Sequence, residues 1–324
     1  FTEYMPGRNR GTWSSRVSFI GNWSYPLCSL IAMGLTPLIS AEWNWRVQLL
    51  IPAILSLIAT ALAWRYFPES PRWLESRGRY QEAEKVMRSI EEGVIHQTGK
   101  PLPPVVIADD GKTPQAVPYS ALLTGVLLKR VILGSCVLIA MNVVQYTLIN
   151  WLPTIFMTQG INLKDSIVLN TMSMFGAPFG IFIAMLVMDK IPRKTMGVGL
   201  LILIAVLGYI YSLQTSMLLI TLIGFFLITF VYMYVCYASA VYVPEIWPTE
   251  AKLRGSGLAN AVGRISGIAA PYAVAVLLSS YGVTGVFILL GAVSIIVAIA
   301  IATIGIETKG VSVESLSIDA VVNK

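Results

Sequence analysis

Long apolar stretches alternate with short polar connectors along the whole chain. Each stretch holds about 20 residues or more, the length that an α-helix needs to cross the roughly 30 Å hydrocarbon core of a bilayer. Backbone polar groups in lipid must be bonded within their own segment, and the alternating strands of a membrane barrel are absent, so the pattern predicts helices. The eight predicted membrane-spanning helices cover residues 17–40, 47–67, 131–157, 166–188, 195–213, 217–243, 256–280 and 283–305. The expected fold class is an all-α membrane protein.

The predicted helices differ in polarity. Those at 47–67, 195–213 and 283–305 carry few polar residues and no polar stripe, and a helix that is apolar on all sides belongs against lipid or inside a packed core. Polar stripes on other helices normally face a bundle interior or a water-filled cavity. The alternative is interhelical hydrogen bonding, worth only about 0.6 kcal/mol on average. The candidate substrate-binding residues are Asn22, Asn142, Gln145, Tyr146, Asn150, Tyr237, Asn260 and Arg264.

Arg264 is the most informative of these candidates. It lies nine residues after Gly255, so about 13 Å along its helix and close to the middle of the bilayer core. An arginine there costs about 2.5–3.5 kcal/mol on insertion scales, which indicates a partner or a wet cavity. Its planar fork of donors suits an anionic or polyhydroxylated substrate. The alternative is a structural pair with a carboxylate or with carbonyl groups freed near Pro271.

Composition excludes several classes of protein. Of the 324 residues 56% are hydrophobic and only 12% are charged, whereas about a quarter of a soluble domain is charged. The chain is therefore not a soluble enzyme, a disordered protein or a secreted disulfide scaffold. The three cysteines show no zinc-ligand spacing and the single histidine, His96, lies in a polar segment, so we expect no metal and no cofactor. A membrane-embedded enzyme is disfavoured because no His, Asp or Glu cluster faces the predicted interior.

Positive charge is distributed unevenly over the connectors. Of the 23 lysines and arginines, 19 lie at 8–10, 65–130, 190–194, 252–254 and after 306, and only Arg46 and Lys164 lie in the alternate set of connectors. Basic loops stay in the cytoplasm, so both termini are predicted to be cytoplasmic. The net charge of +6 follows from this topology, and no nucleic-acid partner is expected.

An internal repeat predicts two similar halves. Glu3-x-x-Pro6 followed by Arg10-Gly11 returns as Glu245-x-x-Pro248 followed by Arg254-Gly255, each time before a predicted helix that contains a proline. Such repeats are typical of secondary transporters. Four predicted helices precede Glu245 within its half. By symmetry we expect about four more before Glu3, and we interpret the chain as truncated.

Four motifs in order carry a family resemblance. They are Pro68–Leu74 with Gly78-Arg79, Asp189-Lys190-x-x-Arg193-Lys194, Glu245-Ile-Trp-Pro-Thr through Arg254-Gly255, and Glu307-Thr-Lys-Gly310. With these motifs the chain resembles the major facilitator superfamily, in its sugar-porter and metabolite–proton symporter branch, and there the inner-membrane metabolite transport proteins of enterobacteria. Three features depart from sugar porters. Pro192 replaces a glycine, Ile306 replaces the proline that precedes Glu-Thr, and the helix at 131–157 ends in Trp151-Leu-Pro153, as in organic-ion and carboxylate symporters.

The resemblance implies an organisation and a mechanism. The eight helices would be equivalent to helices 5–12 of twelve. Residues 1–67 would hold the last two helices of the N-terminal half, 68–128 a cytoplasmic linker with short helices, 129–306 the C-terminal six-helix half, and 307–324 a cytoplasmic tail. Charged residues would hold the cytoplasmic side shut in the outward-facing state. These gate residues are Glu3, Arg10, Glu69, Arg72, Asp189, Arg193, Glu245 and Arg254.

The expected function is secondary active transport by alternating access in the cell inner membrane, as a monomer. The substrate is a sugar, polyol, sugar acid or organic carboxylate, and the resemblance implies protons as the coupling ion. No carboxylate lies deep in a predicted span, so a proton-coupling group is expected in helices that precede this chain. A facilitative uniporter and a truncated, non-transporting membrane protein are the alternatives.

Overall fold

The computed structural model describes residues 10–99, 118–188, 190–248 and 251–309, and these residues are almost entirely helical. The chain divides into two compact units, which are treated separately below. The smaller unit takes in residues 1–14 and 39–113, and the larger takes in 15–38 and 114–324. This grouping follows contacts rather than chain order, so the predicted domain boundaries stay a prediction.

The smaller unit contains one apolar helix and a pair of polar ones. α3 (Ala41–Tyr66) is long and apolar enough to cross a membrane, and none of its most apolar window is buried inside the protein. α4 (Pro71–Ser76) begins at Pro71. The preceding residue, Ser70, caps the helix, and its side chain accepts a hydrogen bond from the Trp73 N–H. α5 (Tyr80–Thr98) ends at Gly99, which takes the left-handed conformation that favours glycine. Two helices, of 6 and 19 residues, therefore follow α3 in this unit.

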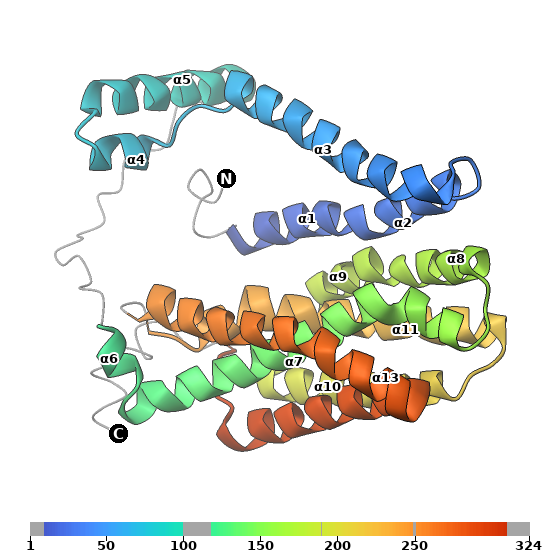
Figure 1. The fold of residues 1–324 in the computed structure, drawn as a ribbon. Helices are drawn as coiled ribbons and strands as arrows, with labels where there is room; N and C mark the ends of the chain where they lie inside the picture. Colours follow the sequence, from blue (N-terminus) through green and yellow to red (C-terminus); the bar gives the residue numbers. More distant parts are fainter. Residues whose placement is uncertain (1–9, 100–117, 189, 249–250, 310–324) are drawn as a thin grey trace. The chain divides into compact units, whose positions relative to one another are not determined.

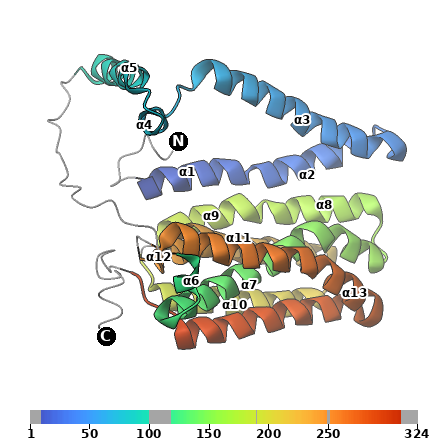
Figure 2. The ribbon, with the colours of Figure 1, turned by 60° about the vertical axis from the view of Figure 1, so that its left-hand side comes forward.

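The larger unit is a bundle in which α7 packs against α13, and α13 also packs against α10. Both contacts can be followed in Figures 1 and 2. Its helices are α1 (Arg10–Asn22) from residue 15 onward, α2 (Ser24–Leu35), α6 (Tyr119–Leu122), α7 (Gly125–Thr158), α8 (Leu163–Met174), α9 (Gly176–Val187), α10 (Arg193–Ser212), α11 (Met217–Val235), the π-helical turn η3 (Cys236–Tyr242), α12 (Val243–Glu245) and α13 (Lys252–Ile304).

The predicted spans can be traced in these helices. Among the described residues, six helical stretches are long and apolar enough to cross a membrane. One of them, α13, has 53 residues and reverses at Gly282, whose φ of 66° and ψ of −162° are not helical. It therefore supplies both predicted spans, 256–280 and 283–305. The remaining predicted span, 17–40, corresponds to α1 and α2 together.

Two of the predicted spans are kinked, each at a one-residue break, Trp23 or Phe175, that keeps right-handed helical φ and ψ. α1 ends at Asn22, four residues before Pro26, and α8 ends at Met174, four residues before Pro178. A proline ring clashes with the carbonyl group of the residue four positions earlier and removes one backbone hydrogen bond, so each break has the same cause. The rings of Trp23 and Phe175, which occupy the two breaks, lie edge to face at 6.3 Å.

Glycine allows close helix packing between α9 and α11. A Cβ on Gly176 would lie 2.9 Å from the Thr229 backbone nitrogen, and one on Gly180 would collide with the Thr229 backbone carbonyl group. Real Cβ atoms do not approach other atoms so closely. The two helices can therefore touch along this line only because both positions lack a side chain.

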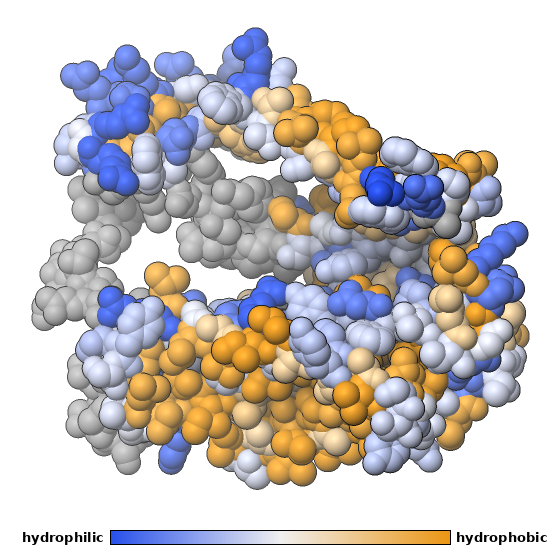
Figure 3. All heavy atoms as spheres, viewed as in Figure 1, coloured by the Kyte–Doolittle hydropathy of each residue, from blue (hydrophilic) through white to orange (hydrophobic). Residues whose placement is uncertain are grey.

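The helices that the sequence predicts to be apolar on all sides expose apolar side chains. α3 exposes Leu49, Leu50 and Leu57, while α10 exposes Ile202 and Val206 on one face and buries the other. The last segment of α13 is similar. Figure 3 shows apolar side chains gathered over the outer surface of the larger unit. Exposed apolar area of this extent suits contact with lipid.

Candidate substrate site and cytoplasmic cluster

The polar residues predicted on two separate helices meet at the contact of α7 with α13. A Cβ on Gly263 would lie 2.8 Å from the Cβ of Leu138 and 3.0 Å from Nδ2 of Asn142, and one on Gly267 would lie 3.2 Å from the ring of Tyr146. These approaches are tighter than ordinary side-chain contacts. The two glycines thus bring the polar face of α7 directly against α13.

Arg264 and Tyr146 form a pair across this contact. The Arg264 Nη1 group donates a hydrogen bond to the Tyr146 hydroxyl group, and the guanidinium carbon lies 6.0 Å from the centre of the Tyr146 ring. Arg264 is exposed and Tyr146 is half-buried. No carboxylate of the described residues pairs with Arg264. From the sequence, a carboxylate was considered as the partner of Arg264. Among the described residues its side-chain partner is instead the phenol of Tyr146.

Asn142 lies behind this pair. Its side chain is only 2% exposed, its Nδ2 donates to the Leu138 carbonyl oxygen at 2.7 Å, and its Oδ1 has no hydrogen-bond partner. Asn150, two turns further along α7, is exposed. Asn260 lies one turn before Arg264 on the exposed side of α13 and donates to the Ser256 carbonyl oxygen at 2.9 Å. Asn142 and Tyr146 therefore lie against α13 beside Arg264, and Asn260 lies one turn earlier on the same helix.

A second polar group, next to the first along α7, surrounds Tyr232. Its hydroxyl group is buried without a regular hydrogen-bond partner, and Tyr25 and Gln145 are its polar neighbours. The rings of Tyr25 and Tyr232 lie 5.1 Å apart. From the sequence, Tyr232 was interpreted as a packing residue and not as a site candidate. The signal that could have found it is Tyr25, which shares the polar stripe of residues 17–40.

Two of the named candidates lie apart from both groups. Asn22 donates its side-chain amide to the Ser18 carbonyl oxygen, four residues earlier, at 2.6 Å. Tyr237 is fully buried, stacks on Tyr242 at 5.0 Å with the rings nearly parallel, and presses its hydroxyl group against Gly197. These contacts describe Tyr237 as a packing residue between η3 and α10, and we leave it out of the proposed site.

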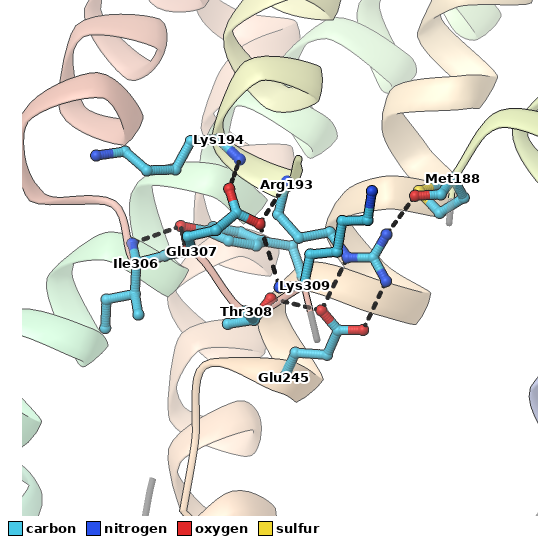
Figure 4. Close-up of polar contacts among 9 residues, drawn as sticks. Met188, Arg193, Lys194, Glu245, Ile306, Glu307, Thr308 and Lys309 are labelled. Carbon is cyan, nitrogen blue, oxygen red and sulfur yellow. Dashed lines mark hydrogen bonds and ion pairs between the residues drawn. The ribbon is translucent and has the colours of Figure 1, made fainter. Parts of the chain in front are cut away.

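A second cluster lies at the start of α10, and its centre is an ion pair between two of the residues predicted to belong to the gate (Figure 4). The Arg193 guanidinium makes two bonds to the Glu245 carboxylate, with Nε–Oε2 at 3.0 Å and Nη2–Oε1 at 3.1 Å. The Arg193 side chain is 7% exposed and that of Glu245 is 34% exposed. Arg193 also donates to the Met188 carbonyl oxygen. Such a bidentate, largely buried pair is stronger and better defined than a surface ion pair.

Glu307 caps α10 from 114 residues away in sequence. Its carboxylate accepts hydrogen bonds from the backbone N–H of Arg193 at 2.7 Å, Lys194 at 3.1 Å and Lys309 at 3.1 Å. Burial works to raise the pKa of the Glu307 carboxyl group, but the three N–H donors and the Arg193 charge together lower that pKa below its usual value. The N-terminus of a helix favours negative charge for the same reason.

The residues around Glu307 extend this cap into a strap, which we define as residues 306–309. Thr308 donates its hydroxyl group to Glu245 Oε2 at 2.6 Å, and Lys309 donates its ammonium group to the Lys190 carbonyl oxygen at 2.6 Å. The Tyr242 hydroxyl group both accepts from the Ile306 N–H and donates to the Ile306 carbonyl oxygen. The strap thus connects α10, η3, α12 and the end of α13 (Figure 4).

The other predicted gate residues are placed only in part. Arg254 lies over the Tyr119 ring, with its guanidinium carbon 5.3 Å from the ring centre. Glu69 is exposed in the smaller unit. Glu3 and Asp189 lie outside the described residues, and for Arg10 and Arg72 only the helix position, in α1 and α4, is described. Of the predicted gate, the larger unit joins Arg193 directly to Glu245.

Three residues that the structure places at or near this cluster were not named as candidates from the sequence. Glu307 and Thr308 were noted only as part of a motif, although an acidic residue directly after an apolar span was a usable signal. Arg130 was not named. It is 3% exposed and donates to the Ile246 carbonyl oxygen at 2.9 Å, which fixes the loop after Glu245 against α7. Among the described residues no group of three or more His, Cys, Asp or Glu could hold a metal ion.

Comparison with known proteins was made over nearly the whole chain. A profile of the Major Facilitator Superfamily matches residues 1–271. The chain is 99% identical over 324 residues to YdjK of Escherichia coli strain K12, a protein assigned provisionally to metabolite transport by its name, and spans 71% of it. It is 44% identical over 319 residues to the inner membrane metabolite transport protein YdjE of the same strain, covering 98% of this chain and 70% of that one.

A solved structure has the same fold. The xylose transporter XylE of Escherichia coli, in a partially occluded inward-open conformation, matches with a TM-score of 0.70 at 18% identity, over 96% of this chain and 67% of that one. A second structure describes XylE as a proton:xylose symporter. At this identity the likeness concerns the fold alone.

Proposed function

The chain belongs to the Major Facilitator Superfamily of membrane transporters, and from that premise we propose that it carries a small polar metabolite across the inner membrane by alternating access, coupled to protons. The substrate is a sugar, polyol, sugar acid or organic carboxylate. Both termini face the cytoplasm, as the basic connectors indicate. The names of YdjK and YdjE support metabolite transport, and the proton coupling of XylE supports symport.

The observation that carries the proposal is the contact between Arg264 and Tyr146 at the glycine-lined seam of α7 and α13. Arg264 is a charged residue within a membrane-spanning helix, and such residues are normally retained for a functional reason. Its neighbours Asn142 and Asn260 supply further hydrogen-bonding groups. The arrangement offers a polar surface at mid-depth in an otherwise apolar bundle, as a transporter requires.

The cytoplasmic cluster serves as the gate in this proposal. Arg193, Glu245 and Glu307 bind one another and the start of α10, so they hold the cytoplasmic ends of the C-terminal half in one arrangement. Alternating access requires those ends to move relative to their surroundings. Because the Arg193 guanidinium is largely buried, breaking its contacts is costly, and the cluster biases the conformational equilibrium.

Facilitated uniport is the second candidate. Within the membrane-spanning helices of the described residues, acidic side chains occur only near the ends, at Glu42, Asp165 and Glu245. A proton-coupling carboxylate at mid-depth is therefore not among these residues. Uniport needs no such group.

Transport by the full-length protein in proteoliposomes separates the two candidates. For a symporter, an imposed inward proton gradient should drive uptake of a labelled substrate above its equilibrium level, and a protonophore should abolish that accumulation. Counterflow without a gradient should occur in either case. If counterflow occurs while the proton gradient has no effect, uniport replaces symport. If none of the sugars, polyols, sugar acids and organic carboxylates that are tested shows counterflow, transport of these substrates is refuted.

A further inference from the structure

Arg264 is exposed on α13, and no acidic side chain of the described residues pairs with its charge. Along α13 it lies about 18 Å from Lys252 and about 27 Å from the reversal at Gly282, deep within the helix on either count. Among the described residues its polar partner is the Tyr146 hydroxyl group, which is neutral. A guanidinium in this position attracts negative charge and repels cations.

The geometry leaves most of the guanidinium available. An arginine side chain has five N–H donors in a fixed fork, and Tyr146 takes one of them at Nη1. Because the Tyr146 oxygen accepts this bond, its own hydrogen is free to point elsewhere. Four guanidinium N–H groups and the phenol O–H therefore have no acceptor among the described residues, so the pair offers mainly donors. A carboxylate, which is made of acceptors alone, complements it.

We propose that the transported metabolite carries a carboxylate group and that Arg264, positioned by Tyr146, binds that carboxylate. This rests on the proposed transport function and names the substrate class within it. Alternating access encloses the substrate between the two halves, so Arg264 must pass from water into a dry site during each cycle. A neutral polyol would leave the guanidinium enclosed without a counter-charge, whereas a carboxylate supplies that charge together with two aligned acceptors.

The neighbouring residues extend the site toward the rest of the substrate. Asn260 lies one turn before Arg264, and with its Nδ2 bonded to Ser256 it presents its amide oxygen as an acceptor for a hydroxyl group. On α7, Gln145 follows the same polar face toward Tyr232 and Tyr25. A small hydroxylated or aromatic acid, with its carboxylate at Arg264, fits this distribution of groups. An organic cation without an acidic group does not.

Matched pairs of probes test the proposal. Each pair differs only in the acid: D-gluconate against D-sorbitol, and nicotinate against nicotinamide. Binding to the purified full-length protein in detergent is measured by calorimetry. For at least one pair we expect the acid to bind at least about 10-fold more tightly than its neutral counterpart, because it adds charge-assisted hydrogen bonds. Equal or tighter binding of both neutral probes, or binding of neither acid, overturns the proposal.

Variants then assign the effect to Arg264. Arg264→Gln should weaken binding of the acid roughly 10- to 100-fold and leave the neutral probe unaffected, while Arg264→Lys, which keeps the charge but loses the fork, should fall between. Arg65→Gln, which removes an exposed arginine near the end of α3, is the matched control and should change neither. Undiminished binding of the acid by Arg264→Gln overturns the proposal. If that variant does not fold, Arg264→Lys and Tyr146→Phe replace it in the test. A reduced preference for the acid supports the proposal, and an undiminished preference in both variants overturns it.

The outcome is distinguishable from failure of the proposed function. Arg264-dependent binding of an acid without counterflow would remove transport and keep this site. Counterflow of a neutral metabolite, unchanged in Arg264→Gln, would keep transport and remove this site.

Discussion

Replacing Glu307 by alanine removes the carboxylate that caps α10 from the far end of the chain. Three backbone N–H groups, those of Arg193, Lys194 and Lys309, lose their acceptor. A net hydrogen bond contributes about 1 kcal/mol and loss of a helix cap costs about 0.5–2 kcal/mol. Water reaches part of this half-buried site and replaces some of the lost bonding. We therefore expect the free energy of unfolding to fall by about 2 kcal/mol.

Thermal unfolding of the purified protein in detergent measures this effect. A loss of about 2 kcal/mol lowers Tm by about 4–8 °C in a domain of this size. Glu307→Gln keeps one acceptor oxygen and should lower Tm by about half as much. Glu91→Gln, which neutralises an exposed glutamate of α5, is the control for the loss of charge alone and should leave Tm unchanged. Should Glu307→Ala unfold at the same temperature as the Glu91→Gln control, the cap contributes no stability and the reasoning is refuted.

The same contact predicts a pH dependence with a definite sign. The folded-state pKa of Glu307 lies below the reference value of 4.5, so the unfolded state binds the proton more readily. The stabilisation is then fully present above about pH 4.5 and is lost as pH falls through the folded-state pKa. The difference in Tm between the natural chain and Glu307→Gln should accordingly be constant from pH 7 to 5 and shrink below pH 4.5. A difference that grows on acidification would contradict this assignment.

Three further predictions concern other contacts. Arg193→Gln and Glu245→Gln should be non-additive in a double-mutant cycle, with a coupling of about 1–3 kcal/mol because the pair is bidentate but Glu245 is a third exposed; additive effects would contradict the pairing. Gly180→Ala should lower stability by about 1–3 kcal/mol because its Cβ collides with the α11 backbone, whereas Gly199→Ala, with open space around it, should be neutral; equal Tm values would refute the close packing. Gly282→Ala should cost about 1–3 kcal/mol through backbone strain alone, since φ is 66° with nothing near the added atom, and an unchanged Tm would show that α13 reverses differently.

Several features of the fold could be predicted from the order of residues. An apolar run of about 20 residues in a bilayer has one way to satisfy its backbone, so the helices lie where the runs lie. The two kinks were also within reach, because each lies about four residues before a proline, at Pro26 and Pro178. Hydropathy alone does not reveal them, since it averages over the proline and does not record its missing donor.

From the sequence alone, the polar residues of the candidate site could be named, but their contacts with one another could not be predicted. Stripes on two helices indicated that Tyr146 and Arg264 face an interior, but helical periodicity cannot say which helix lies opposite. The two glycines of α13 that admit Asn142 and Tyr146 decide that pairing. Tyr237 is also a tyrosine within a predicted span, but the structure shows it packed against Gly197 and Tyr242.

What the sequence by itself determined is therefore local: where helices run and where prolines interrupt them. What only the tertiary structure decided is how distant polar groups meet. Arg193 finds Glu245 over 52 residues and Glu307 over 114. Such contacts depend on how whole helices pack, and packing is set by the shapes of many side chains together, which no local pattern of polarity encodes.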